Sequence, residues 1–170
     1  GLYSHRHGVV SNSVRFTRKA RGMAEQFRDA GYVTGYAGKW HIPDGYGTED
    51  TMPLGFPRDQ ATGPDKDLKP AGPHTVRKTV RDENGVEVEK TFYHPTLQTD
   101  EALQFIEQNS QGQAPWLFVL SWVPPHTPYA SPPQFLERYK GELILPPNVP
   151  KGLPEENARA CLPDYYGMCE

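Results

Sequence analysis

The chain of 170 residues is long enough for one domain with a sizeable core, and its 18 prolines and 16 glycines predict a fold rich in loops. A formal net charge of −3 provides no basic stripe, which argues against a nucleic-acid-binding protein. No apolar run is long enough to span a bilayer, so the sequence predicts no membrane segment.

The first polar cluster lies near the amino terminus, where His5, Arg6 and His7 precede Gly8. Two histidines beside an arginine suit an anion. Paired histidines in a turn, however, more often make hydrogen bonds that support a neighbouring site. We therefore expect a supporting role for this cluster.

A helix followed by a strand is predicted next. Apolar residues follow a helical spacing over residues 14–30, most regularly over residues 23–30, and Gly31 is placed to end the helix in the left-handed conformation. The β-prone run over residues 32–37 follows directly, as in the helix-to-strand step of an α/β sheet. The triplet Lys39-Trp40-His41 then lies at the far end of that strand.

Lys39 and His41 are two residues apart, so an extended backbone points both side chains to the same side. An ammonium offers a compact charge to a tetrahedral oxyanion, and an imidazole exchanges protons near neutral pH. The pair suits an anion site. The plain structural alternative is a surface lysine beside a packed histidine.

The middle of the chain predicts an irregular excursion and then a hairpin. Residues 42–74 are rich in Gly, Pro, Asp and Thr and show almost no periodicity. Residues 75–81 and 86–92 alternate between polar and apolar types, and the turn-favouring pair Asn84-Gly85 lies between them. We predict a β-hairpin there.

A second helix and strand follow the hairpin. Thr99 is a plausible N-cap for a helix over residues 99–109, since acidic residues come directly after it. The continuous apolar run over residues 116–122 has strand length and suits a parallel strand buried on both faces. This run is the candidate for the centre of the sheet.

Three prolines surround His126 directly after that strand and fix the backbone without supplying donors. A histidine held this rigidly suits proton transfer. The alternative is a proline-rich turn whose histidine caps a neighbouring carbonyl. Because open α/β sheets bind ligands at the carboxyl ends of parallel strands, we expect Lys39, His41 and His126 to meet at one edge.

Two further features do not predict a site. The segment Cys161-Leu162-Pro163-Asp164 imitates the start of a Cys-x-Pro-x-Arg nucleophile motif, but Asp164 is followed by no arginine, so we interpret Cys161 as a packed helix residue. His74 and His94 have no polar neighbours at metal-ligand spacing, and we expect loop roles for them. No metal ligand is predicted within the chain.

Taken together, these segments resemble the type I, formylglycine-dependent sulfatases of the alkaline phosphatase superfamily. Residues 1–9 are similar to the stretch after that family's Cys-x-Pro-Ser-Arg signature. The most specific match is residues 27–41, which resemble its Gly-Tyr-x-Thr strand leading to Gly-Lys-Trp-His. Residues 116–129 resemble its buried strand followed by Pro-His-x-Pro-Tyr, and residues 143–150 resemble the segment after that.

The resemblance implies an alkaline-phosphatase-like α/β fold, with a mixed, mainly parallel sheet flanked by helices. It implies that residues 1–170 are an internal fragment of a sulfatase catalytic domain. Residues 42–92 do not match and would be a variable insertion that carries the hairpin at about residues 75–92. A periplasmic or extracellular location is also implied.

The resemblance further implies hydrolysis of sulfate monoesters of a small molecule or a glycan. Lys39 would bind the sulfate group, His41 would contact the formylglycine hydroxyl, and His126 would lie near the leaving-group oxygen. The formylglycine, made from a Cys or Ser, and the ligands of a calcium ion would lie outside the chain. Residues 1–170 alone are therefore expected to be inactive.

Two alternatives stay open at this point. A phosphonate or phosphodiester hydrolase of the same superfamily would share the scaffold and much of the anion site. A non-catalytic module could instead bind a sulfated glycan through His5, Arg6, Lys39 and His126.

Overall fold

The computed structural model describes residues 2–11, 14, 21–40, 56, 61–62, 68–141, 145, 147–148, 152 and 155–170. The chain forms two compact units. The first consists of Gly1–Leu68 with Pro95–Trp122, and the second of Lys69–His94 with Val123–Glu170. Among the residues described, no helix has the length and apolar character needed to cross a membrane.

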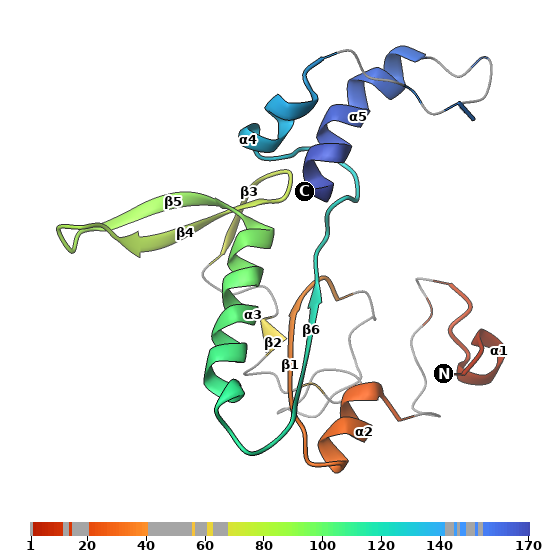
Figure 1. The fold of residues 1–170 in the computed structure, drawn as a ribbon, viewed down its shortest axis with the longest axis vertical. Helices are drawn as coiled ribbons and strands as arrows, with labels where there is room; N and C mark the ends of the chain where they lie inside the picture. Colours follow the sequence, from red (N-terminus) through yellow and green to blue (C-terminus); the bar gives the residue numbers. More distant parts are fainter. Residues whose placement is uncertain are drawn as a thin grey trace. The chain divides into compact units, whose positions relative to one another are not determined.

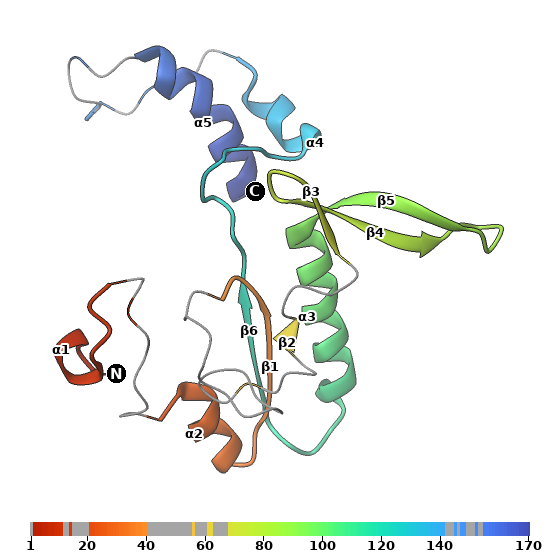
Figure 2. The same cartoon turned by 180° about the vertical axis from the view of Figure 1, so that it is seen from behind.

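A parallel sheet forms the centre of the first unit. Its strands follow the order β2 (Ala61–Thr62), β1 (Val33–Gly38), β6 (Trp116–Ser121). β1 and β6 run side by side in the same direction along their whole lengths, with Tyr36 opposite Val119 (Figures 1 and 2). This pairing confirms that the two predicted helix-then-strand units share one parallel sheet.

The position predicted for β6 is wrong for the described sheet. β1 lies at the centre, because β2 pairs with one of its sides and β6 with the other. β6 is also incompletely buried, with Trp116 38% exposed. An apolar run shows that a strand is packed, but it does not say whether the strand has neighbours on both sides.

Opposite faces of β1 contact different helices. Gly35 lies against α3 (His94–Ser110). An added Cβ there would come within 2.7 Å of two rings, that of Phe105 on α3 and that of Phe118 on β6. Tyr36 faces the other way and packs with Ala24 of α2 (Met23–Asp29). Successive residues of a strand point to opposite faces, so α3 covers one side of the sheet and α2 the other.

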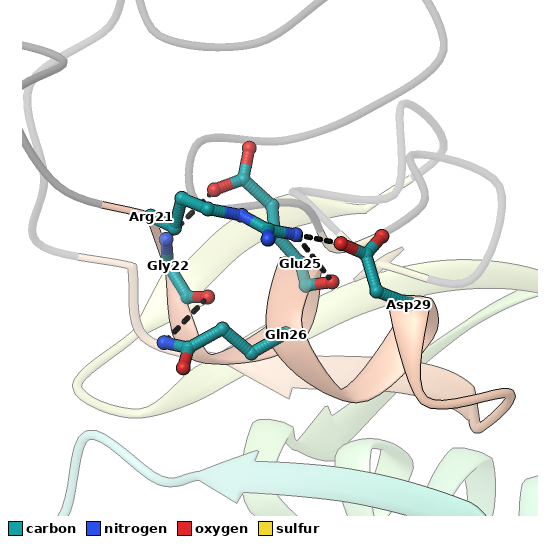
Figure 3. A network of polar contacts seen from close by, with 5 residues as sticks. All are labelled: Arg21, Gly22, Glu25, Gln26 and Asp29. Carbon is teal, nitrogen blue, oxygen red and sulfur yellow. Dashed lines mark hydrogen bonds and ion pairs between the residues drawn. The ribbon is translucent and has the colours of Figure 1, made fainter.

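Polar contacts surround the first turn of α2 (Figure 3). The helix matches the more regular part of the prediction, residues 23–30, to within one residue, and the earlier start predicted at residue 14 is wrong because Gly22 caps the helix. The Glu25 carboxylate accepts a hydrogen bond from Gly22 N–H at 2.7 Å. Arg21 forms an ion pair with Asp29 and donates to the Glu25 carbonyl at 3.4 Å. The ion pair is exposed and contributes about 1 kcal/mol at most. Full burial of the Ala24 methyl group contributes a similar amount, about 0.8 kcal/mol.

The start predicted for the second long helix is wrong. α3 begins at His94, directly after the hairpin, and Pro95 occupies its first turn, where the missing N–H costs no hydrogen bond. Thr99 lies inside the helix instead of capping it. Its hydroxyl donates to the Pro95 carbonyl at 2.8 Å. The hydroxyl of a threonine followed by acidic residues can thus make its hydrogen bond inside a helix as well as at an N-cap.

The second unit contains an antiparallel sheet in the order β3 (Lys69–Gly72), β4 (Thr75–Arg81), β5 (Glu87–Tyr93). β4 and β5 pair along their whole lengths, which confirms the predicted hairpin. At its turn, Gly85 has a φ of 77° and the Asp82 carboxylate accepts two backbone N–H groups at 2.9 Å. β3 was not predicted, because Lys-Pro-Ala-Gly has no strand alternation.

The second unit also contains three helices among the residues described: α4 (Pro133–Leu136), the short 3₁₀ helix η2 (Glu137–Tyr139) and α5 (Glu155–Cys169). The Asp164 carboxylate on α5 accepts hydrogen bonds from Ser131 N–H at 2.8 Å and from its hydroxyl at 3.2 Å. Asp164 therefore connects α5 to the segment before α4. Cys161 is half-buried on the same helix, in agreement with a packing role.

We expect Asp164→Ala to lower the free energy of unfolding of the full-length protein by roughly 1–3 kcal/mol, because two donors of Ser131 lose their acceptor. Asp164→Asn keeps an oxygen acceptor and should recover part of that loss. Chemical denaturation measures both variants. Equal losses would show that the negative charge, and not the acceptor, stabilises this contact.

Gly38 permits the close approach of β1 and β6 at their carboxyl ends. Its φ is 111°, a conformation that side-chain-bearing residues rarely adopt. An added Cβ would also overlap the carbonyl of Ser121 on β6.

Gly38→Ala should lower the free energy of unfolding of the full-length protein by more than about 2 kcal/mol, because it adds backbone strain and forces the two strands apart. Gly141→Ala is the matched control, since no atom of the described residues lies within 4 Å of its added Cβ; we expect a change within about 0.5 kcal/mol. Denaturation curves compare the two. A Gly38→Ala effect as small as the control's would contradict this strand packing.

Candidate functional site

A backbone hydrogen bond joins the carboxyl ends of β1 and β6. Lys39 N–H donates to the Ser121 carbonyl at 2.6 Å. From within β1, the Tyr36 hydroxyl donates to the carbonyl of Lys39. The backbone of Lys39 is therefore held on both sides, while the residue itself is exposed at the edge of the sheet.

Trp40 anchors the next position of the chain in an aromatic cluster. Its ring meets Tyr36 edge to face, with centroids 5.0 Å apart and an interplanar angle of 86°. It also meets the buried Phe56 edge to face at 6.4 Å. Such pairs each add about 0.5–1.5 kcal/mol beyond the area they bury. The packing fixes the backbone directly after Lys39.

The Lys39 ammonium is suited to attract an anion. Within the part of the chain that the structure describes, no acidic side chain forms an ion pair with it. An ammonium is a compact charge with three donors, and the carboxyl edge is where α/β sheets bind ligands. Lys39 therefore places an exposed ammonium at the end of a rigid strand, and its role in anion binding stays a prediction.

The predicted meeting of three site residues stays a prediction. His41 lies outside the described residues. Lys39 belongs to the first unit and His126 to the second. What the structure adds is the local geometry of Lys39 and of His126, each taken separately.

His126 lies in the loop after β6, where the peptide bonds before Pro125 and Pro128 are cis. Its Nδ1 is 2.6 Å from the carbonyl oxygen of Thr127. That oxygen only accepts, so Nδ1 carries the hydrogen in this contact. Nε2 is then the nitrogen left for proton transfer, as a base in the neutral ring and as an acid in the imidazolium.

The contact with Thr127 is the carbonyl cap that the sequence offered as the alternative role for His126. The two roles are compatible, because the cap uses Nδ1 and proton transfer would use Nε2. A carbonyl that accepts from Nδ1 fixes the tautomer and orients the ring.

His74 supports this loop, a role that sequence reasoning missed. Its Nε2 lies 3.0 Å from the carbonyl oxygen of His126 and 2.9 Å from that of Pro128. Its own carbonyl accepts a hydrogen bond from His94 N–H at 2.8 Å. No local sequence signal indicates the side-chain contacts, because the partner carbonyls lie more than 50 residues further along the chain.

The amino-terminal histidines make local contacts. α1 (Ser4–His7) is a single turn that ends at Gly8, whose φ is 81°. The Nδ1 of His7 accepts a hydrogen bond from Val9 N–H at 3.1 Å, and His5 stacks on Tyr3 with centroids 5.9 Å apart. These contacts are local to residues 3–9, and the supporting role of the cluster stays a prediction.

The described residues also provide no metal site, since no three His, Cys, Asp or Glu side chains among them lie close enough to hold an ion. His94 and Tyr93 are both partly buried at the junction of β5 and α3. Burial lowers the pKa of His94 and raises the pKa of Tyr93, so both favour their neutral forms at neutral pH.

Residues 1–143 match the family model for sulfatases. The chain is 31% identical to the ulvan-active sulfatase of Formosa agariphila over 170 residues, which cover 98% of the chain and 32% of that relative. It is 28% identical to the uncharacterized sulfatase YidJ of Escherichia coli K12 over 155 residues, or 82% of the chain and 29% of that relative. The chain thus spans about a third of the length of these relatives.

Among solved structures, the chain is similar to a protein in complex with its substrate D-glucosamine-2-N,6-O-disulfate. The TM-score is 0.59 at 21% identity, over 86% of this chain and 27% of that one. This likeness and the parallel sheet confirm the predicted alkaline-phosphatase-like α/β fold class. Because the family match covers most of the sequence, including Lys39, His41 and His126, the chain belongs to the sulfatase family.

Proposed function

We propose that the whole protein hydrolyses sulfate monoesters, with Lys39 binding the sulfate group, His41 contacting the nucleophile and His126 protonating the leaving oxygen. The observation that carries this proposal is the hydrogen bond from Lys39 to Ser121. It joins the carboxyl ends of two parallel strands, and a proposed site residue follows each of them. Membership of the sulfatase family supports the chemistry.

The proposed role of Lys39 is electrostatic. Negative charge builds on the sulfate oxygens and on the leaving oxygen as the S–O bond breaks. A cation aimed at that charge lowers the barrier most when it needs no reorganisation. The fixed backbone on both sides of Lys39 supports such a role, since only the side chain has to find the anion.

The proposed role of His126 is general acid catalysis. The leaving oxygen keeps the electron pair of the broken S–O bond and takes the proton from Nε2 of the imidazolium. The Thr127 carbonyl supports this step, because it accepts from Nδ1 and stabilises the positive charge of the protonated ring.

Formylglycine and calcium are further parts of the proposal for the whole protein. When present, the first supplies the group that attacks sulfur and the second neutralises charge on the sulfate oxygens. The described residues do not fit a calcium site, because they hold no cluster of metal-ligating side chains. The roles of Lys39 and His126 above use only groups of this chain.

We propose a sulfated carbohydrate as the substrate class. Two similar proteins support this choice: one relative is named as active on ulvan, and one solved structure holds a disulfated glucosamine as its substrate.

The full-length protein should turn over an aryl sulfate faster than the matching aryl phosphonate. Steady-state kinetics measure both rates, and a preference for the phosphonate would favour the phosphonate hydrolase.

Lys39→Ala should lower kcat/KM for sulfate esters by roughly 10²–10³-fold. The loss should be similar for good and poor leaving groups, because Lys39 acts on the group being transferred. Lys90→Ala, which removes an exposed ammonium of β5, is the control and should leave the rate unchanged. Steady-state kinetics measure the loss for each variant.

His126→Ala should lower kcat by roughly 10²–10⁴-fold for sulfate esters with poor leaving groups, because their leaving oxygen needs a proton. The loss should shrink for an activated aryl sulfate. Rates across a series of leaving groups measure the difference. Equal losses across the series would mean that His126 positions the substrate and does not protonate it.

A further inference from the structure

We infer that His74 is a positioning residue, which holds the loop of His126 in the orientation that proton transfer requires; this rests on the acid role proposed for His126. The Nε2 atom of His74 lies 3.0 Å from the His126 carbonyl oxygen and 2.9 Å from that of Pro128. Both oxygens only accept, so Nε2 carries a hydrogen and shares it between them.

This shared hydrogen bond holds the two peptide groups that flank the Thr127–Pro128 peptide. The carbonyls of residues 126 and 128 are directed to His74, whereas the carbonyl of Thr127 lies against Nδ1 of the His126 ring. Rotation of either flanking peptide would turn the Thr127 carbonyl away from Nδ1. His74 therefore acts on the imidazole through the backbone, without contacting its Nε2.

The backbone of His74 provides an independent indication of function. Its φ is 51°, and it is the one non-glycine residue with positive φ in the described ranges. This conformation costs energy for a residue with a side chain and persists where the surroundings require it. His74 lies in the turn between β3 and β4, and its carbonyl accepts His94 N–H at 2.8 Å. The strained turn aims the side chain at the loop.

The contact does not depend on the protonation of His74. The neutral tautomer with hydrogen on Nε2 and the imidazolium both donate from that atom. The hydrogen bond is therefore available in both forms of the His74 ring.

Three substitutions in the full-length protein separate the side-chain contact from the strained turn. His74→Asn keeps a residue that tolerates positive φ, but its amide is too short to reach the carbonyls. His74→Gln places an amide N–H near the position of the imidazole Nε2. His74→Ala removes both the side-chain donor and the tolerance of positive φ.

For a sulfate ester with a poor leaving group, we expect His74→Ala and His74→Asn to lower kcat by roughly 5- to 20-fold with KM nearly unchanged, as when one exposed hydrogen bond is lost. His74→Gln should recover most of the rate. Rates for an activated aryl sulfate should stay near wild type in all three. Wild-type activity in His74→Asn, or equal losses for both esters, would overturn the inference.

A double-mutant cycle tests whether His74 acts through His126. In a His126→Ala background, His74→Ala should cause no further loss of kcat, because the group it positions is gone. Additive losses would show that His74 acts elsewhere and would also overturn the inference.

Amide hydrogen exchange tests the contact without relying on turnover. His126 N–H donates to the Val123 carbonyl at 3.1 Å, and its exchange should be several-fold faster in His74→Ala and near wild type in His74→Gln. Unchanged exchange in His74→Ala would overturn the inference even in an active sulfatase. Faster exchange in a protein that hydrolyses no sulfate ester would remove the proposed function, while the hold of His74 on the loop would stand.

Discussion

The close parallel pairing of β1 and β6 is the contact on which the arrangement of the first unit depends. Six residues of each strand are in register, and the last pair is Gly38 with Ser121. Gly35 lets Phe105 and Phe118 close over one face, and Gly38 lets the strand ends approach. A methyl group at either glycine would need the space that the neighbouring strand or helix occupies. The position of Lys39 follows from this packing.

Local patterns predicted the elements whose signals are local. The hairpin was found because Asn84-Gly85 and the alternation on both sides are encoded in adjacent residues. The start of α3 was missed because Thr99 can bond to the helix carbonyl behind it as readily as it can cap. The central place of β1 was missed because strand order depends on partners distant in sequence. That residues 42–92 are a variable insertion stays a prediction.

The residues of the candidate site likewise divide into those that a local sequence pattern indicates and those that it does not. Lys39 and His126 could be selected because each follows a strand, and strand ends are visible in a sequence. The role of His41 stays a prediction, as does the meeting of the three residues. His74 could not be selected, because its partners are main-chain carbonyls 52 and 54 residues away, and any amino acid supplies a carbonyl.

That last property determines which changes the His126 loop can absorb. The acceptors of His74 are backbone atoms, so substitutions at Thr127 or Pro128 leave carbonyls where they are needed as long as the backbone keeps its path. One inserted or deleted residue would instead bring the wrong carbonyl towards Nε2, because neighbouring carbonyls point in different directions. The contact with His74 thus depends on the length of the loop and not on its side chains. Loop length should therefore vary less than loop sequence among proteins that share this histidine.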